Sequence, residues 1–102
     1  MKFAVIGVGS WGTTLANLLC HNGHEVKLWA RETEVADGIN GARQNPFFVT
    51  HLHLHPSLVC TNNPGEALEN AQLAVISIPS TFIRPVIEPY KSQLKKLAGI
   101  AN

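Results

Sequence analysis

The glycine-rich stretch Gly7-Val8-Gly9-Ser10-Trp11-Gly12 constrains the fold of this chain more than any other feature. It follows an apolar run over residues 3–6 and precedes a helical pattern over residues 13–22. A G-x-G-x-x-G fingerprint is weak alone, but between a strand and a helix it indicates a turn that binds phosphate groups. There Gly7 permits a tight turn, Gly9 leaves room for a pyrophosphate, and Gly12 lets the helix pack closely on the sheet. Because free N–H groups and the helix dipole face one point, the stretch predicts a dinucleotide ligand.

The rest of the chain alternates between strand patterns and helix patterns. We predict strands over residues 2–8, 25–30, 58–61 and 73–78, and the beginning of a fifth over residues 98–102. Helices are expected over residues 13–22, 31–42, 63–70 and from Ser80 onward, with the last one interrupted at Pro85 and Pro89. This order predicts an α/β fold with a doubly wound parallel sheet of the Rossmann type, in which the first strand lies between the second and the fourth.

Two loop regions carry more specific signals. The sequence Asn63-Pro64-Gly65-Glu66 predicts a helix start with Asn63 as the N-cap and Glu66 reaching back to it in a capping box. The alternation His51-Leu52-His53-Leu54-His55 predicts an extended segment with its histidines on one side. These histidines could hold a metal, but no carboxylate or cysteine lies nearby in the sequence. We therefore expect an exposed loop face and no metal site.

Length and composition fit a single domain. The chain has 102 residues, of which 45% are hydrophobic and 15% charged, and its formal net charge is +1. This composition gives no reason to expect nucleic acid or an anionic membrane as a partner. No segment has the length of a membrane span or of a signal peptide, so a cytoplasmic location is the default expectation. Cys20 and Cys60 lack the spacing of a disulfide framework or a zinc site, and we expect both to be buried and unreactive.

Several segments resemble the N-terminal cofactor domain of the NAD(P)-dependent glycerol-3-phosphate dehydrogenases. The resemblance is carried by the stretch from Gly7 to Ala16, by Asn22-Gly23-His24-Glu25-Val26 and by Leu28-Trp29-Ala30-Arg31. Arg43 with Asn45-Pro46-Phe47-Phe48 resembles the family's Arg-x-Asn-x-x-Tyr stretch, and Ile78-Pro79-Ser80 with Arg84 resembles its Val-Pro-Ser segment and following arginine. The Gly-Ser-Trp-Gly form of the turn is far rarer than the general fingerprint. Phe48 departs from the usual tyrosine, and residues 51–55 replace a stretch that is usually richer in Gly, Pro and Lys.

The resemblance implies a function in glycerophospholipid metabolism. The reaction would be the interconversion of dihydroxyacetone phosphate and glycerol 3-phosphate by hydride transfer with NADPH or NADH. The resemblance also implies that NAD or NADP contacts Ser10, Trp11, Arg31 and Phe48, and that Pro79 and Ser80 lie near the nicotinamide. Together with Gly7, Gly9 and Gly12 of the turn, these residues form the candidate cofactor site.

Several of these residues have a second interpretation. The turn can be a tight connection without a ligand, and Arg31 can be an exposed cation at a helix start. Ser10 can be a helix N-cap, and Trp11 can be a packing aromatic. Position 30 is Ala, where NAD-specific domains carry an acidic residue, and the neighbouring Arg31 could bind the 2′-phosphate of NADP. Glu32 could still bind a ribose hydroxyl, as in NAD. The choice between NAD and NADP therefore stays open.

We interpret residues 1–102 as one dinucleotide-binding domain that ends before the family's helical substrate domain. The resemblance implies a catalytic lysine after the fifth strand, beyond Asn102, and none of Lys91, Lys95 and Lys96 matches it. We therefore expect no catalytic residue within this chain and no turnover by it alone. In the full-length enzyme a small phosphorylated substrate is the further partner, and a homodimer stays open. The alternatives are another two-domain NAD(P)-dependent dehydrogenase, or a free-standing nucleotide-binding or redox-sensing module without turnover.

Overall fold

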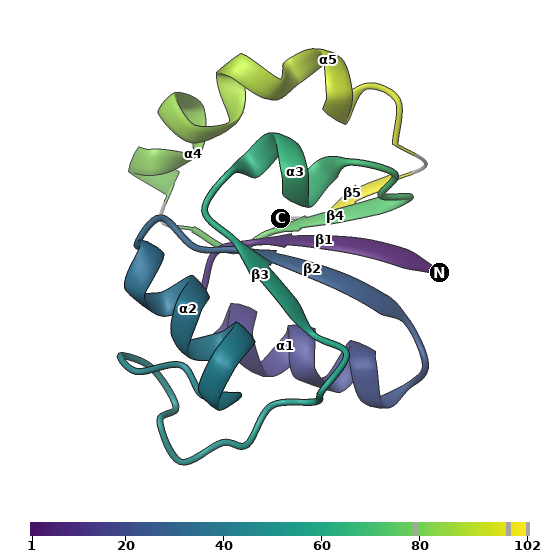
Figure 1. The fold of residues 1–102 in the computed structure, drawn as a ribbon. Helices are drawn as coiled ribbons and strands as arrows, with labels where there is room; N and C mark the ends of the chain where they lie inside the picture. The colour runs from purple at the N-terminus through teal and green to yellow at the C-terminus, as the bar shows by residue number, and fades with distance from the viewer. Residues whose placement is uncertain (79, 98, 102) are drawn as a thin grey trace.

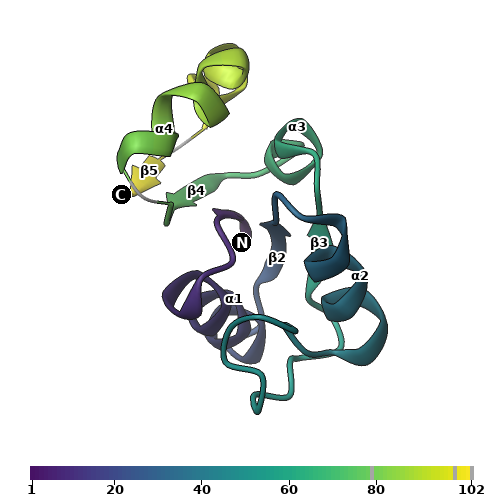
Figure 2. The ribbon, with the colours of Figure 1, turned by 90° about the vertical axis from the view of Figure 1, so that its left-hand side faces the viewer.

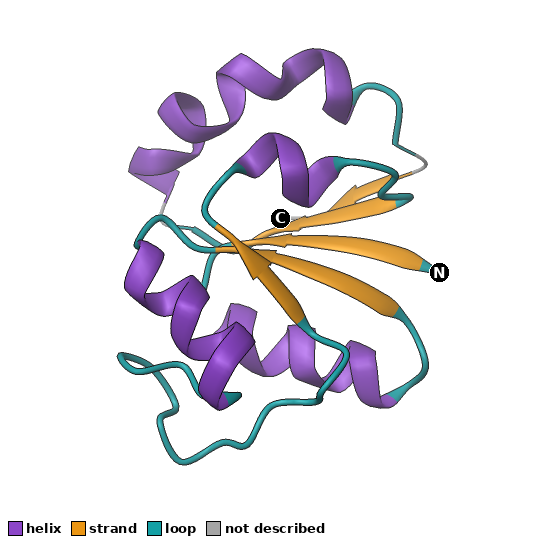
Figure 3. Ribbon diagram, viewed as in Figure 1, coloured by secondary structure: helices purple, strands orange, loops and turns teal. Residues whose placement is uncertain are grey.

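A parallel sheet lies between two layers of helices in the computed structural model, which describes residues 1–78, 80–97 and 99–101 (Figure 1). The sheet order is β3-β2-β1-β4-β5, with the strands β1 (Lys2–Ile6), β2 (Glu25–Trp29), β3 (Val59–Thr61), β4 (Leu73–Ile76) and β5 (Gly99–Ala101). One face is covered by α1 (Ser10–His21) and α2 (Thr33–Ala42). The other is covered by α3 (Pro64–Leu68), α4 (Ser80–Ile87), the 3-10 helix η1 (Glu88–Tyr90) and α5 (Lys91–Leu94) (Figure 3). The predicted doubly wound sheet is confirmed, and β1 does lie between β2 and β4.

The central strand β1 is apolar on both faces because helices cover both sides of the sheet. Val5 packs into the core under α1 and α2, while Ala4 and Ile6 pack into the core under α3 and α5. All three are fully buried. Burying a side chain such as Val5 or Ile6 contributes about 1.5–3 kcal/mol each. This double burial explains why the strand reads as a continuous apolar run rather than as an alternation.

Several strands end earlier than predicted. β1 ends at Ile6 rather than at Val8, because Gly7, with a φ of 127°, leaves the strand geometry. β2 and β4 end at Trp29 and Ile76, also before the predicted residues. The positions that follow these strands therefore belong to the connections at the sheet edge.

Two helices begin at residues other than those predicted. α2 begins at Thr33 rather than at residue 31, and α1 begins at Ser10 rather than at Thr13. The N-cap of α1 is Gly9. The prediction of Ser10 as an N-cap is therefore wrong, since this serine already has helical geometry.

The fifth strand is confirmed over the residues that the structure describes. β5 runs parallel to β4, with Gly99 opposite Leu73 and Ala101 opposite Val75. Asn102, the last residue of the predicted range 98–102, lies outside the described residues, as does residue 98. The expectation that the family's catalytic lysine lies beyond Asn102 concerns positions past this strand, and it stays a prediction.

The signals at α3 and α4 are only partly confirmed. The side chain of Asn63 caps α3 by accepting a hydrogen bond from the Gly65 N–H at 2.9 Å, as predicted. The capping box is wrong, because Glu66 instead accepts a hydrogen bond from the Thr61 hydroxyl at 2.6 Å. The predicted interruption at Pro85 is also wrong. This proline lies inside α4, where it removes only one backbone hydrogen bond, and the helix type changes after Ile87, at η1.

The long segment between α2 and β3 is held by side chains rather than by secondary structure. Arg43 ends α2 in the left-handed conformation, and its Nη1 donates to the carbonyl oxygens of His55 at 3.1 Å and Leu58 at 2.5 Å. The Asn17 Oδ1 accepts from the His55 N–H at 2.7 Å. These bonds satisfy backbone groups that no neighbouring strand pairs, which a segment packed against a core requires.

The leucines and histidines of residues 51–55 point to opposite sides, as the alternation predicts. Leu54 is fully buried and Leu52 packs against the core, while His51 and His53 are exposed. The exposed face predicted for all three histidines is wrong for His55, which is half-buried and packs edge-on against the His21 ring at 4.8 Å. Among the residues that the structure describes, no three His, Cys, Asp or Glu side chains gather as metal ligands do. The absence of a functional metal site at these histidines stays a prediction. Within the same residues, no helix combines the length and the apolarity needed to cross a bilayer.

Both cysteines are free and buried, as predicted. Burial raises the pKa of the Cys60 thiol from its ordinary value of 9.0 to about 12. Burial also raises the pKa of Cys20, against the opposing effects of a Ser57 hydrogen bond and the Arg43 charge. A thiol with a raised pKa stays in its unreactive protonated form at neutral pH.

The raised pKa of Cys60 predicts a loss of stability in alkaline solution. The folded chain keeps the thiol protonated, so its contribution is complete below pH 9.0 and is lost as the pH rises toward about 12. Urea unfolding at several pH values should show the free energy of unfolding falling more steeply for the wild type than for Cys60→Ala, by up to about 1.4 kcal/mol per pH unit. Parallel slopes for the two proteins would contradict this assignment.

Candidate functional site

The candidate site lies at the edge of the sheet where the strands end, which faces the viewer in Figure 2. Here the glycine-rich turn connects β1 to α1, and Ser77 and Ile78 follow the neighbouring strand β4. From β1 the chain proceeds outward through β2 to β3, and then crosses back to β4 on the other side of β1. Open α/β sheets bind ligands where the connections diverge in this way.

Gly7 and Gly12 allow the turn, α1 and the end of β4 to approach one another closely. Gly7 has a φ of 127°, and a Cβ there would lie 2.6 Å from the Ser77 carbonyl oxygen. A Cβ on Gly12 would overlap the Gly7 carbonyl oxygen and would lie 2.5 Å from the Ser77 Oγ. Both distances are shorter than real Cβ contacts, so neither position accepts a side chain without movement of the backbone. The predicted tight turn and close helix packing are confirmed.

Gly9 serves a different purpose, because a Cβ there would meet no atom within 4 Å. Its backbone has a φ of −62°, which any residue can adopt, so neither crowding nor strain explains the glycine. Ser10, Trp11 and Gly12 form the first turn of α1, and their N–H groups have no acceptor within the helix. The first helical bond is the 3.0 Å contact from the Thr13 N–H to the Gly9 carbonyl oxygen. Backbone donors and the positive end of the helix dipole are therefore gathered beside open space.

A cleft of about 350 Å³ lies beside this turn. Its wall is largely apolar and its rim carries two charged side chains, those of Arg31 and Glu32, which are both exposed; the other lining residues are Gly7, Val8, Trp29, Ile78, Pro85 and Val86. The indole N–H of Trp29 donates to the Asn62 carbonyl oxygen at 3.0 Å, which fixes the ring in the wall. Such a cleft suits a flat apolar ring that is joined to anionic groups.

The structure brings together some of the residues predicted for the site. Gly7 and Arg31 line the same cleft, and Gly9, Ser10, Trp11 and Gly12 form the donor-bearing turn beside it. Trp11 is 64% exposed, so its interpretation as a packing aromatic is wrong. Phe48 is 43% exposed and lies in the segment after α2. Pro79 lies outside the described residues, and Ser80 begins α4. Contact of these residues with a cofactor stays a prediction.

Asn45 has a structural role at the glycine-rich turn that the sequence motifs did not predict. Its side chain is fully buried and bonds to the Val8 carbonyl oxygen, the Thr13 hydroxyl and the N–H groups of Phe47 and Phe48. In the sequence this asparagine precedes a proline, which indicates only the end of a helix. The one signal that includes it is the Arg-x-Asn-x-x-Tyr resemblance, and that signal assigns it no partner.

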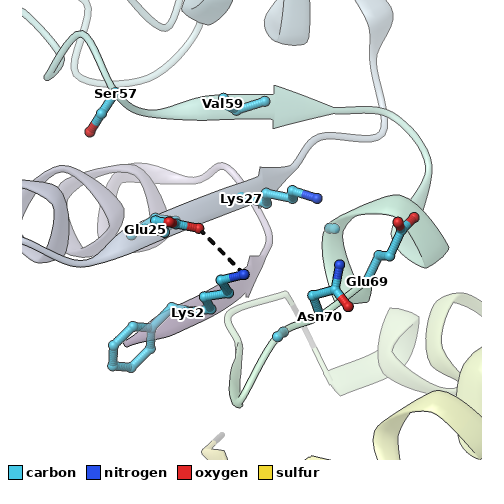
Figure 4. Close-up of a pocket in the computed structure, with 11 residues that line it drawn as sticks. Lys2, Glu25, Lys27, Ser57, Val59, Glu69 and Asn70 are labelled. Carbon is cyan, nitrogen blue, oxygen red and sulfur yellow. Dashed lines mark ion pairs between the residues drawn. The ribbon is translucent and has the colours of Figure 1, made fainter.

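A second cavity, of about 280 Å³, lies at the opposite edge of the sheet, where the strands begin (Figure 4). Its lining includes an ion pair between Lys2 and Glu25, whose charged atoms are 4.0 Å apart and whose side chains are more than half exposed. Lys27 and Glu69 add one further charge of each sign. Exposed ion pairs contribute little, and mixed charges favour neither an anionic nor a cationic ligand. The glycine-rich turn therefore remains the candidate site.

Comparison with known proteins gives a consistent result. The family model described as the N-terminus of NAD-dependent glycerol-3-phosphate dehydrogenase matches residues 2–102. A protein of Nitratidesulfovibrio vulgaris named glycerol-3-phosphate dehydrogenase of the NAD(P)+ type is 43% identical over 95 residues, which are 93% of this chain and 29% of that protein. A protein of the same name from Trichlorobacter lovleyi is 37% identical over 102 residues, all of this chain and 31% of that protein. The chain thus spans about a third of the length of these curated relatives.

Solved structures show the same arrangement of elements. The crystal structure of glycerol-3-phosphate dehydrogenase from Coxiella burnetii matches with a TM-score of 0.83 and 28% identity, over 91% of this chain and 29% of that one. The enzyme of the same name from Saccharomyces cerevisiae matches with a TM-score of 0.88 over 99% of this chain and 33% of that one. At 23% identity, the second match supports the fold alone.

Proposed function

Since the chain belongs to the family of NAD-dependent glycerol-3-phosphate dehydrogenase N-terminal domains, we propose that residues 1–102 bind NAD or NADP at the glycine-rich turn. They would act as the cofactor domain of an oxidoreductase that interconverts dihydroxyacetone phosphate and glycerol 3-phosphate. The observation that carries the proposal is the open space in front of Gly9, which the N–H groups of the first turn of α1 border. The relatives named above are called NAD(P)+ enzymes, which agrees with a nicotinamide dinucleotide as the ligand.

The residues present fit such a ligand in three respects. The space at Gly9 admits a pyrophosphate, and the helix N-terminus supplies donors and a favourable dipole for its charge. The apolar wall that contains Ile78 and Val86 suits the face of an aromatic base. Arg31 and Glu32 at the rim stand close to the end of β2, where ribose groups of dinucleotides are recognised. We assign these residues to binding and orienting the cofactor.

The bound nicotinamide would supply the hydride, and this chain would hold it in place. Hydride transfer to a ketone leaves negative charge on its oxygen, so a cation or proton donor must lie within hydrogen-bond reach of that oxygen. Lys2 begins β1 at the far edge of the sheet, and Lys91 to Lys96 follow α4 back toward that edge (Figure 1). We propose that the substrate site is built by residues that the relatives carry outside the matched segment, with the catalytic lysine beyond Asn102. The free thiols of Cys20 and Cys60 fit a reducing compartment, so the proposal includes a cytoplasmic location.

Replacing Gly9 tests the proposed position of the pyrophosphate. Gly9→Val should retain the fold, because the added carbons enter open space at a φ of −62°, but they would occupy the volume assigned to the phosphates. Isothermal titration with NADH should show an affinity loss of at least about tenfold, equivalent to about 1.4 kcal/mol. Gly41→Val is the matched control, since a Cβ there also meets open space but lies in the last turn of α2. Equal affinity of Gly9→Val and the wild type would refute this placement.

Replacing Arg31 tests whether the chain distinguishes NADP from NAD. If this exposed guanidinium binds a 2′-phosphate through charge-assisted hydrogen bonds, Arg31→Ala should weaken NADPH by about tenfold or more and NADH by less than about threefold. Lys95→Ala, which removes an equal charge at the end of α5, should change neither affinity. Equal losses for the two cofactors in Arg31→Ala would show that this side chain does not read the 2′-phosphate.

A further inference from the structure

We propose that Asn45 is a positioning residue for dinucleotide binding. Its buried amide holds the peptide between Val8 and Gly9 in the one orientation that points the Gly9 N–H toward the pyrophosphate. This inference rests on the proposed function, because it concerns how the same turn is kept competent to bind. A loop residue outside the glycine-rich stretch would thus help to fix the backbone conformation of that stretch.

The Asn45 side chain uses its whole hydrogen-bonding capacity within the core. Its Nδ2 donates to the Val8 carbonyl oxygen at 2.8 Å and to the Thr13 Oγ1 at 3.0 Å. Its Oδ1 accepts from the N–H groups of Phe47 at 3.0 Å and Phe48 at 3.1 Å. An amide has two N–H donors and two oxygen lone pairs, so all four are matched. The orientation of the amide is thereby fixed by its partners.

The Val8 carbonyl is the group through which this contact acts on the turn. It accepts a second hydrogen bond, from the Thr13 hydroxyl at 2.9 Å, and both donor side chains are fully buried. The carbonyl therefore points into the core. Across the trans peptide that follows, the Gly9 N–H points the opposite way, away from this contact with the core. Within the described part of the chain, no hydrogen bond uses this N–H, which leaves it available to a ligand.

The same amide also fixes the segment that carries the two exposed phenylalanines. By accepting from both N–H groups, the Asn45 oxygen closes a tight turn of its own backbone at Phe47 and Phe48, which are 55% and 43% exposed. The Asn45 side chain thus contacts both the glycine-rich turn and the segment that carries Phe47 and Phe48. A change that frees the amide would release the Val8 peptide and this segment at once.

Asn17 provides a natural comparison because it is a second buried asparagine. It lies on α1 and its Oδ1 accepts from the His55 N–H, so it ties the far end of the same loop segment to the core. Removing either amide leaves backbone groups without their hydrogen-bond partner, which lowers the free energy of unfolding by about 1–3 kcal/mol. Only Asn45 contacts the turn, so only its loss should change the affinity of the folded protein for phosphates.

The test compares ligands that contain the pyrophosphate with one that does not. NADH, ADP and adenosine are titrated by NMR or calorimetry against the wild type, Asn45→Ala, Asn17→Ala and Thr13→Val, with the folded fraction measured by urea unfolding. Asn45→Ala should weaken NADH and ADP by at least about tenfold while leaving adenosine within about twofold. Asn17→Ala should bind all three ligands as the wild type does. Thr13→Val, which removes the other donor to the Val8 carbonyl, should reproduce the Asn45→Ala pattern in milder form.

The outcomes distinguish failure of the proposed function from failure of the inference about Asn45. If the wild type binds neither NADH nor ADP, the proposed function itself is wrong and the inference falls with it. If the wild type binds but Asn45→Ala retains its affinity, or loses all three ligands equally, Asn45 is merely structural and the inference is overturned. If Asn45→Ala does not fold, Thr13→Val gives the answer: selective loss of NADH and ADP supports the inference, and unchanged affinities refute it.

Discussion

The close approach of α1 to the ends of β1 and β4 is the contact on which the site depends. Gly12 places the first turn of the helix against the Gly7 carbonyl and Ser77, with no room for a side chain between them. Because the helix is held so near the sheet, the free N–H groups of its first turn lie between the ends of β1 and β4, where the connections of the sheet diverge. A helix displaced by a methyl group would carry the same donors away from the cleft, so packing and binding geometry are inseparable here.

Polar side chains take the place of backbone pairing on the α2 side of the sheet. Asn40 donates to the Cys60 carbonyl oxygen at 2.7 Å and accepts from the Cys60 N–H at 2.8 Å, so it pairs with the edge strand β3 as another strand would. Arg43, Asn17 and Asn45 hold the segment that precedes β3. Several backbone groups of the long connection between α2 and β3 are thereby hydrogen-bonded where it lies against the core. Through Asn45 the connection is also bonded to the Val8 carbonyl in the glycine-rich turn.

Much of the fold follows from local signals in the sequence, whereas the site geometry does not. Apolar runs such as Leu73 to Ile76 and the glycine spacing predict the sheet and its order, because they reflect burial and close packing. The start of α1 at Ser10 escaped prediction because Gly12 is a poor helix former, and packing on the sheet outweighs that preference. Asn45 escaped because a polar residue before a proline looks the same whether it is exposed or buried at the centre of a hydrogen-bond network. Its partners Val8 and Thr13 are remote in sequence, and only the fold brings them together.

The central claim is that a nicotinamide dinucleotide binds at the glycine-rich turn. The most direct test is to follow the backbone amide signals of the isotope-labelled chain by NMR during titration with NADH. The account predicts saturable shifts that are largest at Gly9, Ser10 and Trp11, with smaller ones at Arg31, and little change around the cavity at Lys2 and Glu25. Shifts that concentrate at that opposite cavity, or a turn that stays unchanged at saturating NADH, would contradict it.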